Sequence, residues 1–191
     1  MDRPFYDRPV LDVARELVGC VLRHGDTAGV IVETEAYHMS EAACHAYVGL
    51  TARTSVLFGP PGLAYVYRSY GIHALLNAVC EPEDVGAAVL IRAIEPTEGI
   101  EVMRARRGPV ADRELTNGPG KLTQALGIGL ELNATSLLGD GPIEIAPRLD
   151  GADVDVLRTA PRIGITKAVD LDWRFTARGS RFVSRPLPLE R

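Results

Sequence analysis

Residues 20–35 read CVLRHGDTAGVIVETE, two apolar runs on either side of a polar turn. Both runs, 20–23 and 28–35, are rich in the aliphatic and β-branched residues that favour strands. The triplet His24-Gly25-Asp26 between them is typical of a tight turn, because glycine adopts turn conformations at little steric cost. The stretch therefore predicts a β-hairpin, and with it a largely antiparallel sheet.

The rest of the chain contains the signals of short strands and short helices. Asp7 is placed to cap a helix that ends near Gly19, and Ser40 is placed to cap a second one. The helix after Ser40 is expected at 41–46. Further strands are expected at 64–68, 72–79, 87–93, 141–147 and 162–166, and further helices at 96–107 and 120–126. Because strands and helices do not alternate regularly, the pattern favours an α+β fold. No repeat, low-complexity tract or linker is found, which predicts a single domain over residues 1–191.

The composition is that of a globular protein, with 46% hydrophobic and 24% charged residues among 191. No run approaches a membrane-spanning length, and the first ten residues carry charges on both sides of any short apolar run, unlike a signal peptide. Cys20, Cys44 and Cys80 are widely spaced, which is typical of free thiols in a reducing cytosol, and they lack the Cys-x-x-Cys spacing of zinc sites. We therefore expect a cytoplasmic protein without a bound metal or a membrane partner.

Two carboxylates stand at the end of the second strand of the hairpin. Glu33, Glu35 and Tyr37 alternate along the chain, so they share one face of the strand. A carboxylate beside an aromatic ring is suited to act as a general base, because partial burial raises its pKa toward neutral pH. An ordinary solvated strand end is the alternative that these residues leave open.

The region 42–80 contains no Asp or Glu and holds four of the six tyrosines. Tyr65 and Tyr67 share a face of a predicted strand, where ordinary packing explains Tyr65 well. Tyr70 falls at the tip of the following turn, close to Arg68. An exposed ring at a hairpin tip with a cation nearby is placed to insert between bases, as wedge residues do when they displace a nucleotide.

Two known sequence motifs, the nucleotide-binding phosphate loop and the zinc deaminase pattern, are not matched by this chain. Residues 117–122, Asn-Gly-Pro-Gly-Lys-Leu, lack the first glycine of a nucleotide-binding phosphate loop, and Leu122 stands where Ser or Thr would bind magnesium. Lys121 and the start of the following helix remain suited to a single phosphate. The His-x-Glu and Pro-Cys-x-x-Cys pattern of the zinc deaminases is absent, which excludes base deamination of that type.

Taken together, these segments resemble the alkyladenine (3-methyladenine) DNA glycosylase family, whose bacterial members match nearly the whole chain, from about residue 4 to 184. The matching segments are 32–37, 43–46, 58–62, 65–67 with 70–71, 77, 89–96, 117–122 with 124–126, 162–164 and 173–175. Each segment is short, but the ordered set is specific. The resemblance implies one domain with a curved antiparallel sheet, surrounding short helices and a protruding hairpin, similar to the C-terminal domain of formyltransferases.

The resemblance also implies a catalytic role for three residues. Glu35 matches the general base that activates the water attacking the sugar carbon of a flipped nucleotide. Arg92 and the backbone carbonyl of Ile163 match the other groups that hold this water. An alkylated purine carries positive charge and leaves readily, so a positioned water and an aromatic pocket suffice for it. No residue matches a Schiff-base lysine, so the implied reaction is monofunctional, needs no cofactor and leaves an abasic site.

Other matching residues are implied to bind the base and the DNA. Tyr37, His45 and Tyr67 match the pocket walls that sandwich the extruded base, with Ala43 in the same segment as His45. Asn77 matches a side chain that disfavours normal guanine. The residues implied to contact DNA are Tyr70, which fills the gap in the minor groove, Arg68, Ile72 and Lys121.

The chain departs from the family at residues 38–41, where His-Met-Ser-Glu replaces Leu-Gly-Pro-Glu-Asp and is one residue shorter. This loop borders the pocket, so the preference among lesions is left open. Two other functions remain as alternatives. A non-catalytic protein that binds damaged DNA would not need Glu35 and Arg92, and a one-carbon-transfer accessory domain has no use for a tyrosine hairpin.

The charged residues are segregated along the chain, although the net charge is only −4. Residues 157–191 carry eight basic and three acidic side chains, whereas 128–156 carry six acidic side chains and one arginine. With 42–80 free of acids, this distribution predicts a basic face toward DNA and an acidic back. The expected partner is duplex DNA with damaged purines, bound by a monomer.

Overall fold

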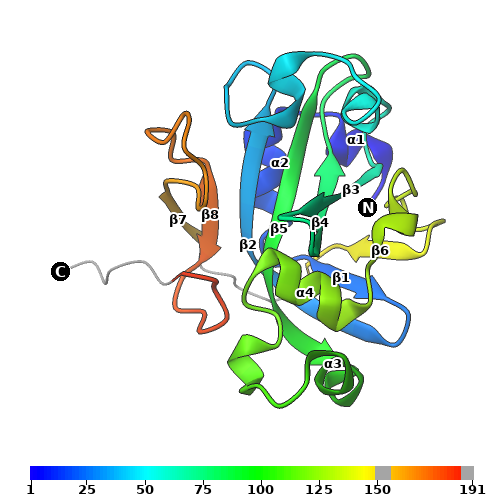
Figure 1. Cartoon of the computed structure of the whole chain (residues 1–191), viewed down its shortest axis with the longest axis vertical. Coiled ribbons are helices and arrows are strands. Elements are labelled where there is room, and N and C mark those ends of the chain that lie inside the picture. The colour runs from blue at the N-terminus through cyan, green and yellow to red at the C-terminus, as the bar shows by residue number, and fades with distance from the viewer. Residues whose placement is uncertain (149–155, 186–191) are drawn as a thin grey trace.

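Two long strands lie at the centre of the molecule. β2 (Thr27–His38) and β5 (Ala87–Glu98) pair antiparallel along most of their length, and Figure 1 shows them side by side. Both contain runs in which every residue is buried, because other parts of the chain cover both of their faces. The computed structural model describes residues 1–148 and 156–185, with the backbone alone for 156–158.

The described strands form one curled sheet. Its order is β3 (Ala64–Ser69), β4 (His73–Val79), β5, β2, β1 (Val21–His24) and β6 (Ile143–Ala146). β8 (Arg174–Ala177) also pairs with β2, and β7 (Val156–Ala160) pairs with β8. All of these pairings are antiparallel. The predicted α+β fold with an antiparallel sheet is therefore confirmed.

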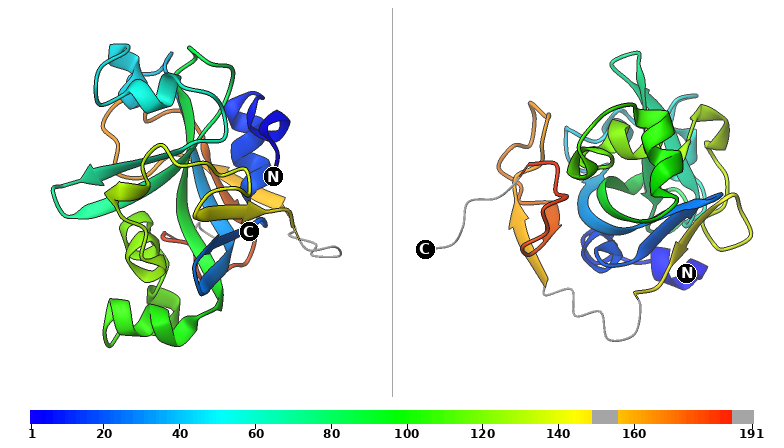
Figure 2. Two further views of the ribbon diagram at one scale, coloured as in Figure 1. Left: turned by 90° about the vertical axis from the view of Figure 1, so that its right-hand side faces the viewer. Right: turned by 90° about the horizontal axis from the view of Figure 1, so that it is seen from below.

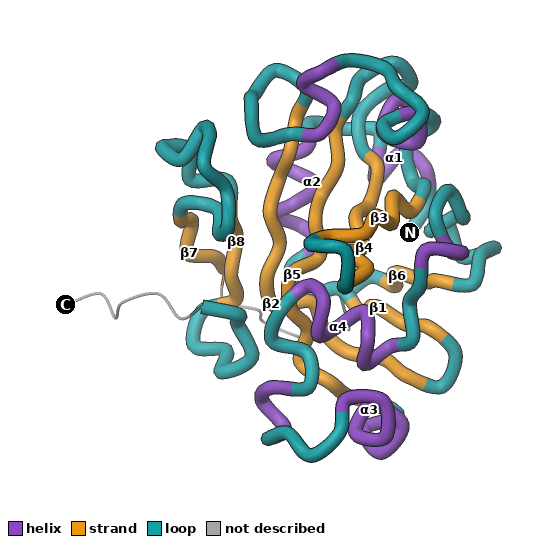
Figure 3. The backbone as a smooth tube through the Cα atoms, in the orientation of Figure 1, coloured by secondary structure: helices purple, strands orange, loops and turns teal. Residues whose placement is uncertain are grey.

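Short helices surround the sheet. They are α1 (Arg3–Tyr6), α2 (Val10–Leu17), α3 (Ile100–Arg107), α4 (Pro119–Leu126) and the 3-10 helices η1 (His45–Val48), η2 (Ser55–Phe58), η3 (Asp112–Glu114) and η4 (Leu130–Leu132). α2 lies against β2, where the Thr34 hydroxyl donates to the Ala14 carbonyl at 2.7 Å. Figure 3 shows the loops that join these elements. No helix in the described residues is long and apolar enough to cross a membrane.

α4 supports the hairpin formed by β3 and β4. The Thr123 hydroxyl donates to the Ala74 carbonyl of β4 at 2.7 Å. Gly120 lies so close to His73 that a Cβ atom in its place would come within 2.8 Å of that side chain. Beyond this contact the hairpin projects from the body of the molecule, as Figure 2 shows.

The pairing of β2 with β5 is irregular near its middle. The register shifts on both sides of the pair formed by Glu33 and Ala93, so Val32 in β2 and Arg92 in β5 have no residue opposite them. Such bulges change the direction in which neighbouring side chains point. Arg92 therefore departs from the regular alternation of its strand at the place where two carboxylates of β2 lie.

Two predicted helix starts are wrong. α2 begins at Val10 behind Pro9, and Asp7 ends α1 instead of capping α2. α3 begins only at Ile100, because β5 continues through Pro96, which still pairs with β2. In both places a proline lies before the helix: Pro9 immediately precedes α2, and Pro96 belongs to β5.

The helix predicted at 41–46 is also wrong. The segment forms turns, and η1 begins only at His45. Cys44 precedes η1 and its sulfur accepts an N–H of the helix, whereas the Ser40 hydroxyl hydrogen-bonds with the ring of His38. This part of the chain is therefore held by individual side chains and not by a regular helix.

The strand predicted at 162–166 is a loop, and the strands β7 and β8 on either side of it have no counterpart in the prediction. The loop residues alternate between apolar and polar, which is the pattern of a strand. The backbone N–H of Ile163, however, donates to the side chain of Glu35 at 2.7 Å. This donor is therefore not available to a neighbouring strand.

Candidate active site

A cavity of about 740 Å³ opens between the β3–β4 hairpin, the end of β2, the start of α4 and the loop 163–167. Its volume is within the usual range of small-molecule sites, which is about 300–1,000 Å³. The predicted site residues that line it are Tyr37, Ala43, His45, Tyr67, Arg68, Tyr70, Asn77, Arg92, Lys121 and Ile163. Glu35 lies behind the lining with no exposed surface, and Ile72 lies on the exposed hairpin tip.

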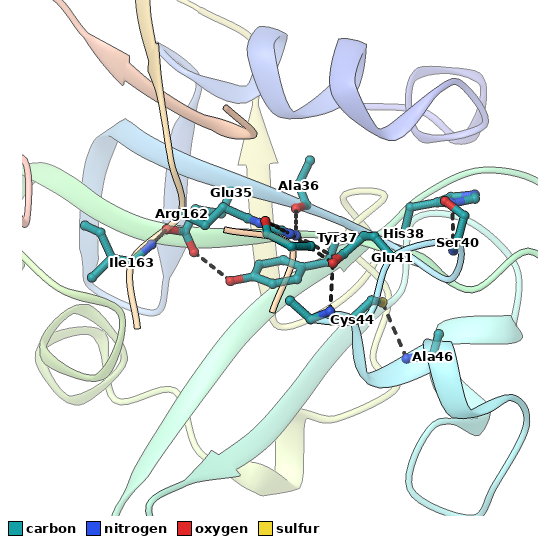
Figure 4. Close-up of polar contacts among 12 residues, drawn as sticks. Glu35, Ala36, Tyr37, His38, Ser40, Glu41, Cys44, Ala46, Arg162 and Ile163 are labelled. Atoms are coloured by element: carbon teal, nitrogen blue, oxygen red, sulfur yellow. Dashed lines mark hydrogen bonds and ion pairs between the residues drawn. The ribbon is translucent and has the colours of Figure 1, made fainter. Parts of the chain in front are cut away.

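The carboxylate of Glu35 accepts three hydrogen bonds. Its Oε1 accepts from the backbone N–H of Ile163 at 2.7 Å, and its Oε2 accepts from the Tyr37 hydroxyl at 2.8 Å and from Arg92 Nη1 at 3.0 Å. All three donors belong to residues that line the cavity. Figure 4 shows the hydrogen bonds of Tyr37 and Ile163 to the carboxylate of Glu35. The solvated strand end is thus excluded, because Glu33 and Glu35 are both fully buried.

Opposing effects act on the pKa of Glu35. Burial raises it, while the positive charge of Arg92, the N–H of Ile163 and the Tyr37 hydroxyl lower it. Burial has the larger effect, and the pKa of this carboxyl lies above that of an ordinary glutamate. A carboxylate of this kind is a stronger base than one in water, so it suits the removal of a proton near neutral pH.

Arg92 lies between the two carboxylates of β2. Its Nε is 3.4 Å from Glu33 Oε1, in addition to the bond that its Nη1 donates to Glu35. Glu33 is also 3.1 Å from Arg174 Nε, and it accepts from the backbone N–H and the hydroxyl of Ser184 at 2.6 and 2.9 Å. Glu33 therefore fixes the guanidinium of Arg92 and joins β8 and the segment after it to the site.

Three aromatic rings form a cluster on one side of the cavity. Tyr65 and Tyr67 are stacked with centroids 5.4 Å apart, and the His45 ring meets Tyr67 edge-on at 4.6 Å. Arg53 Nη2 lies 3.4 Å from His45 Nε2, and an arginine can only donate. His45 Nε2 is therefore the acceptor, and Nδ1 carries the proton that it shares with the Tyr65 hydroxyl at 3.1 Å.

The same histidine is neutral at physiological pH. Burial lowers the pKa of His45, and the positive charge of Arg53 lowers it further. Burial also raises the pKa of Tyr67 to about 12, so its hydroxyl stays protonated. The rings of this cluster carry no charge of their own that would repel a cationic ligand.

The remaining predicted binding residues lie on the cavity wall or at its mouth. The Asn77 amide nitrogen donates to the carbonyl of Tyr65 at 3.0 Å, which fixes the orientation of the amide. The backbone N–H of Ala43 donates to Glu41 at 2.8 Å. Lys121 Nζ at the start of α4 donates to the side chain of Asn117 at 2.8 Å.

The hairpin tip presents two large apolar side chains to solvent. Tyr70 is 88% exposed and Ile72 is 77% exposed, and Figure 2 shows how far the hairpin extends. Tyr70 has a φ of 48°, in the left-handed region that non-glycine residues rarely adopt, and Gly71 follows with a φ of 72°. The tight turn therefore holds the tyrosine at the outermost point of the hairpin, with Arg68 exposed two residues before it, near the tip.

The charges around the cavity are of one sign. Among the described residues that line it, five are basic and none is acidic; the basic ones are Arg53, Arg68, Arg92, Lys121 and Lys167. The lining has the sign of charge expected of a basic face, and the acidic back stays a prediction. Part of the charge count on which that prediction rests, in 149–155 and 186–191, lies outside the described residues. Within the described ranges, no three His, Cys, Asp or Glu side chains are grouped to hold a metal ion.

Comparison with known proteins identifies the family of the chain. The sequence model of the methylpurine-DNA glycosylases matches residues 4–181. The chain belongs to the methylpurine-DNA glycosylase family.

Three relatives of this glycosylase-family chain, each described as a "Putative 3-methyladenine DNA glycosylase", illustrate the similarity. One from Rhodopseudomonas palustris (strain HaA2) is 55% identical over 184 residues, which cover 96% of this chain and 90% of the relative. One from Bradyrhizobium diazoefficiens is 51% identical, with 98% and 92% covered. One from Methanoculleus marisnigri is 49% identical, with 95% and 96% covered.

Several residues at the site of this methylpurine-DNA glycosylase-family protein were not identified from the sequence. They are Arg53 beside His45, Arg174 and Ser184 on Glu33, and the pair formed by Glu41 and Arg162. Most lie more than 100 residues from their partners in the chain, so no local spacing marks them. Two signals were available: Arg162 and Arg174 stand in the matching segments 162–164 and 173–175, and basic residues are in excess after residue 157.

Proposed function

We propose that this protein is a monofunctional DNA glycosylase that takes an alkylated or deaminated purine, flipped out of duplex DNA, and hydrolyses its N-glycosidic bond. The observation that carries the proposal is the placement of Glu35, a buried carboxylate with a raised pKa, directly behind an aromatic cavity. The names of the relatives support the choice of 3-methyladenine as one substrate.

In the proposed reaction the carboxylate of Glu35 takes a proton from a water molecule. The water oxygen forms a bond to C1′ of the sugar, and the purine leaves with the electron pair of the N-glycosidic bond. Arg92, 3.0 Å from the carboxylate, orients it and keeps it ionised for this step. The Ile163 N–H and the Tyr37 hydroxyl also donate hydrogen bonds to this carboxylate. Together with Arg92 they fix the orientation of its two oxygens. We propose the Ile163 carbonyl as the second acceptor for the water.

The pocket suits a positively charged purine. Tyr37 and Tyr67 line the cavity with aromatic rings, which attract a cation, and the ring of His45 is neutral. Arg162 lies over one face of Tyr37 and Arg53 over one face of Tyr67, so we propose the other faces for the base. An alkylated purine is a good leaving group because it already carries the positive charge that its departure neutralises. A neutral lesion such as hypoxanthine needs a proton on the leaving base. Its excision is therefore expected to depend more strongly on solution pH.

We assign the recognition of DNA to the hairpin and the basic rim. Tyr70 fills the gap that the flipped nucleotide leaves, and Ile72 and Arg68 lie beside it in the minor groove. Lys121 contacts a phosphate at the start of α4, which is an eight-residue helix. Flipping costs a few kcal/mol and less for a weakly paired lesion, which itself contributes to selection. We propose that the protein acts on DNA in the cytoplasm, as a monomer.

The test uses duplexes that contain hypoxanthine, ethenoadenine or 3-methyladenine, incubated with the protein and EDTA and then treated with alkali. Strand breaks are expected only after alkali, with or without EDTA. Breaks without alkali contradict a monofunctional reaction, and a requirement for metal contradicts the mechanism. Binding of the lesion duplex without any breaks identifies a non-catalytic damage-binding protein instead.

Glu35→Gln tests the assignment of the base. This variant is expected to bind the lesion duplex but to excise at least about 10²-fold more slowly, the usual contribution of a general base. Glu95→Gln is the matched control, since Glu95 lies exposed on the neighbouring strand β5. Full activity of Glu35→Gln removes this residue from its proposed role.

A further inference from the structure

Arg162 is a buried cation that does not line the cavity but contacts several parts of its wall. It is 5% exposed. Its Nη1 donates to Glu41 Oε1 at 2.6 Å and to the Ala36 carbonyl at 2.9 Å, and its Nη2 donates to Glu41 Oε2 at 2.9 Å and to the Ala168 carbonyl at 3.4 Å. The two parallel bonds to Glu41 are the bidentate geometry that only an arginine offers.

The same guanidinium lies against two aromatic rings. Its central carbon is 4.6 Å from the centroid of the Tyr37 ring and 5.3 Å from the ring of Trp173. Figure 4 shows Arg162 close to Tyr37 and joined to Glu41 by dashed lines. Tyr37 lines the cavity and Arg162 does not. The contact between them therefore supports a wall of the pocket without occupying the space where a base would lie.

Two further parts of the site are tied to Arg162. The next residue, Ile163, donates its N–H to the carboxylate of Glu35, so the position of Arg162 along the loop sets this bond. Glu41 Oε2 also accepts the N–H of Ala43, which lies in the lining segment 42–45. One guanidinium thus joins the aromatic wall, the loop on the general base and the segment that carries His45.

The burial of this ion pair is not explained by stability alone. Desolvation of a buried arginine and glutamate offsets most of their attraction, and apolar residues of similar volume often stabilise a fold as well or better. What the pair adds is geometry, since four hydrogen bonds and two ring contacts fix one orientation of the guanidinium. The chain departs from the family pattern in the loop 38–41. Glu41, the last residue of this loop, anchors it to Arg162.

We propose that Arg162, held by Glu41, is a positioning residue that sets the shape of the base pocket and thereby the choice among damaged purines. This inference rests on the proposed glycosylase function. Loss of the pair is expected to let Tyr37 and the segment 42–45 move relative to each other. Lesions of different shape would then lose different amounts of their binding and of their excision rate.

The test compares Arg162→Lys and Glu41→Gln with Arg8→Lys as the control. Arg8 makes the same kind of bidentate pair with Glu16, at 3.1 and 2.8 Å, and lies 4.7 Å from the ring of Phe5. Arg8 and its two partners, Glu16 and Phe5, do not line the cavity. Single-turnover excision rates are measured for duplexes with hypoxanthine and with ethenoadenine, and the ratio of the two rates is the readout. The ratio is independent of the fraction of active protein in a preparation.

Arg162→Lys and Glu41→Gln are each expected to change this ratio by about tenfold, since a displacement of about 1 Å in a site costs up to about 10²-fold in rate. Arg8→Lys is expected to leave the ratio unchanged. Equal loss of both rates, or no loss, overturns the inference. If Arg162→Lys does not fold, Glu41→Gln, which keeps the size of the side chain, decides the question in the same way.

A second readout separates this inference from the proposed function. The emission of ethenoadenine depends on the rings stacked against it, so a change in its emission when the protein binds the duplex reports capture even where nothing is excised. If the wild-type protein captures the base but never excises it, the proposed catalysis fails. Arg162→Lys and Glu41→Gln are then still expected to alter the emission of the captured base, and emission equal to that of the wild type overturns the positioning role.

Discussion

The Tyr37 hydroxyl donates to Glu35 Oε2 across 2.8 Å, from two residues further along the same face of β2. The Tyr37 ring lines the cavity, whereas Glu35 has no exposed surface. One residue therefore forms a wall of the pocket and also lowers the pKa of the group proposed to act as the base. These two roles can be separated experimentally, because the ring and the hydroxyl can be changed independently.

Tyr37→Phe keeps the ring and removes the hydrogen bond. Because that bond favours the ionised carboxylate, its loss is expected to raise the pKa of Glu35 further. Excision then falls most at acidic pH and approaches the wild-type rate at alkaline pH. A pH series of single-turnover rates measures this, with Tyr47→Phe as control. A loss by the same factor at every pH contradicts the interpretation.

The wild-type protein is expected to lose activity as the pH falls through the raised pKa of Glu35. Burial makes protonation easier, so the carboxylate is neutralised at a higher pH than an ordinary glutamate, which titrates at about 4.3. A duplex with 7-methylguanine is the proper substrate, since this cationic base needs no added proton to leave. An excision rate that falls to half of its plateau only at about pH 4.3 would show that Glu35 has an ordinary pKa.

The hairpin and the shared face of the carboxylates were predictable because their information is local. Alternation places Glu33, Glu35 and Tyr37 on one side of a strand wherever that strand lies. Their partners depend on tertiary structure, since Arg162 is 121 residues from Glu41 and Ser184 is 151 residues from Glu33. No spacing in the sequence indicates which of the many arginines reaches which carboxylate.

The loop 162–166 shows why a local pattern also misled. Its apolar residues alternate as in a strand, but in the fold the N–H of Ile163 meets the buried carboxylate of Glu35. A buried carboxylate must accept hydrogen bonds, and Glu35 accepts one from the backbone N–H of Ile163. This N–H therefore cannot donate to a neighbouring strand. The error in secondary structure and the function of the loop therefore have the same cause.

Tyr70→Ala tests the wedge at the hairpin tip. Hypoxanthine pairs well with cytosine and poorly with thymine, so the cost of flipping differs between the two duplexes. Excision opposite cytosine is expected to fall about tenfold more than excision opposite thymine, because filling the vacated stack offsets a cost of a few kcal/mol. Tyr47→Ala is the control, since Tyr47 is also exposed but lies in η1. Equal losses opposite both bases count against a wedge.

Tyr6→Phe tests a feature of the core. The Tyr6 hydroxyl is buried without a hydrogen-bond partner among the described residues, while the ring is fully packed. Removal of an unsatisfied hydroxyl keeps the packing and relieves its desolvation cost, so the free energy of unfolding is expected to rise by about 1 kcal/mol. Urea denaturation measures this, and Tyr47→Phe at an exposed site should leave it unchanged. A decrease of similar size would mean that the hydroxyl is stabilised in the fold.

Lys121→Ala tests whether the basic rim of the cavity contacts phosphates. Binding that releases one counterion per neutralised phosphate makes the logarithm of affinity fall with the logarithm of salt concentration, with a slope of about −0.9 per contact. The variant is expected to bind a lesion duplex more weakly and to show a slope shallower by about that amount. Arg113→Ala is the control, because Arg113 is exposed but does not line the cavity. A slope that changes equally in both variants would mean that only the net charge of the protein matters, and that the side chain at the start of α4 has no phosphate of its own.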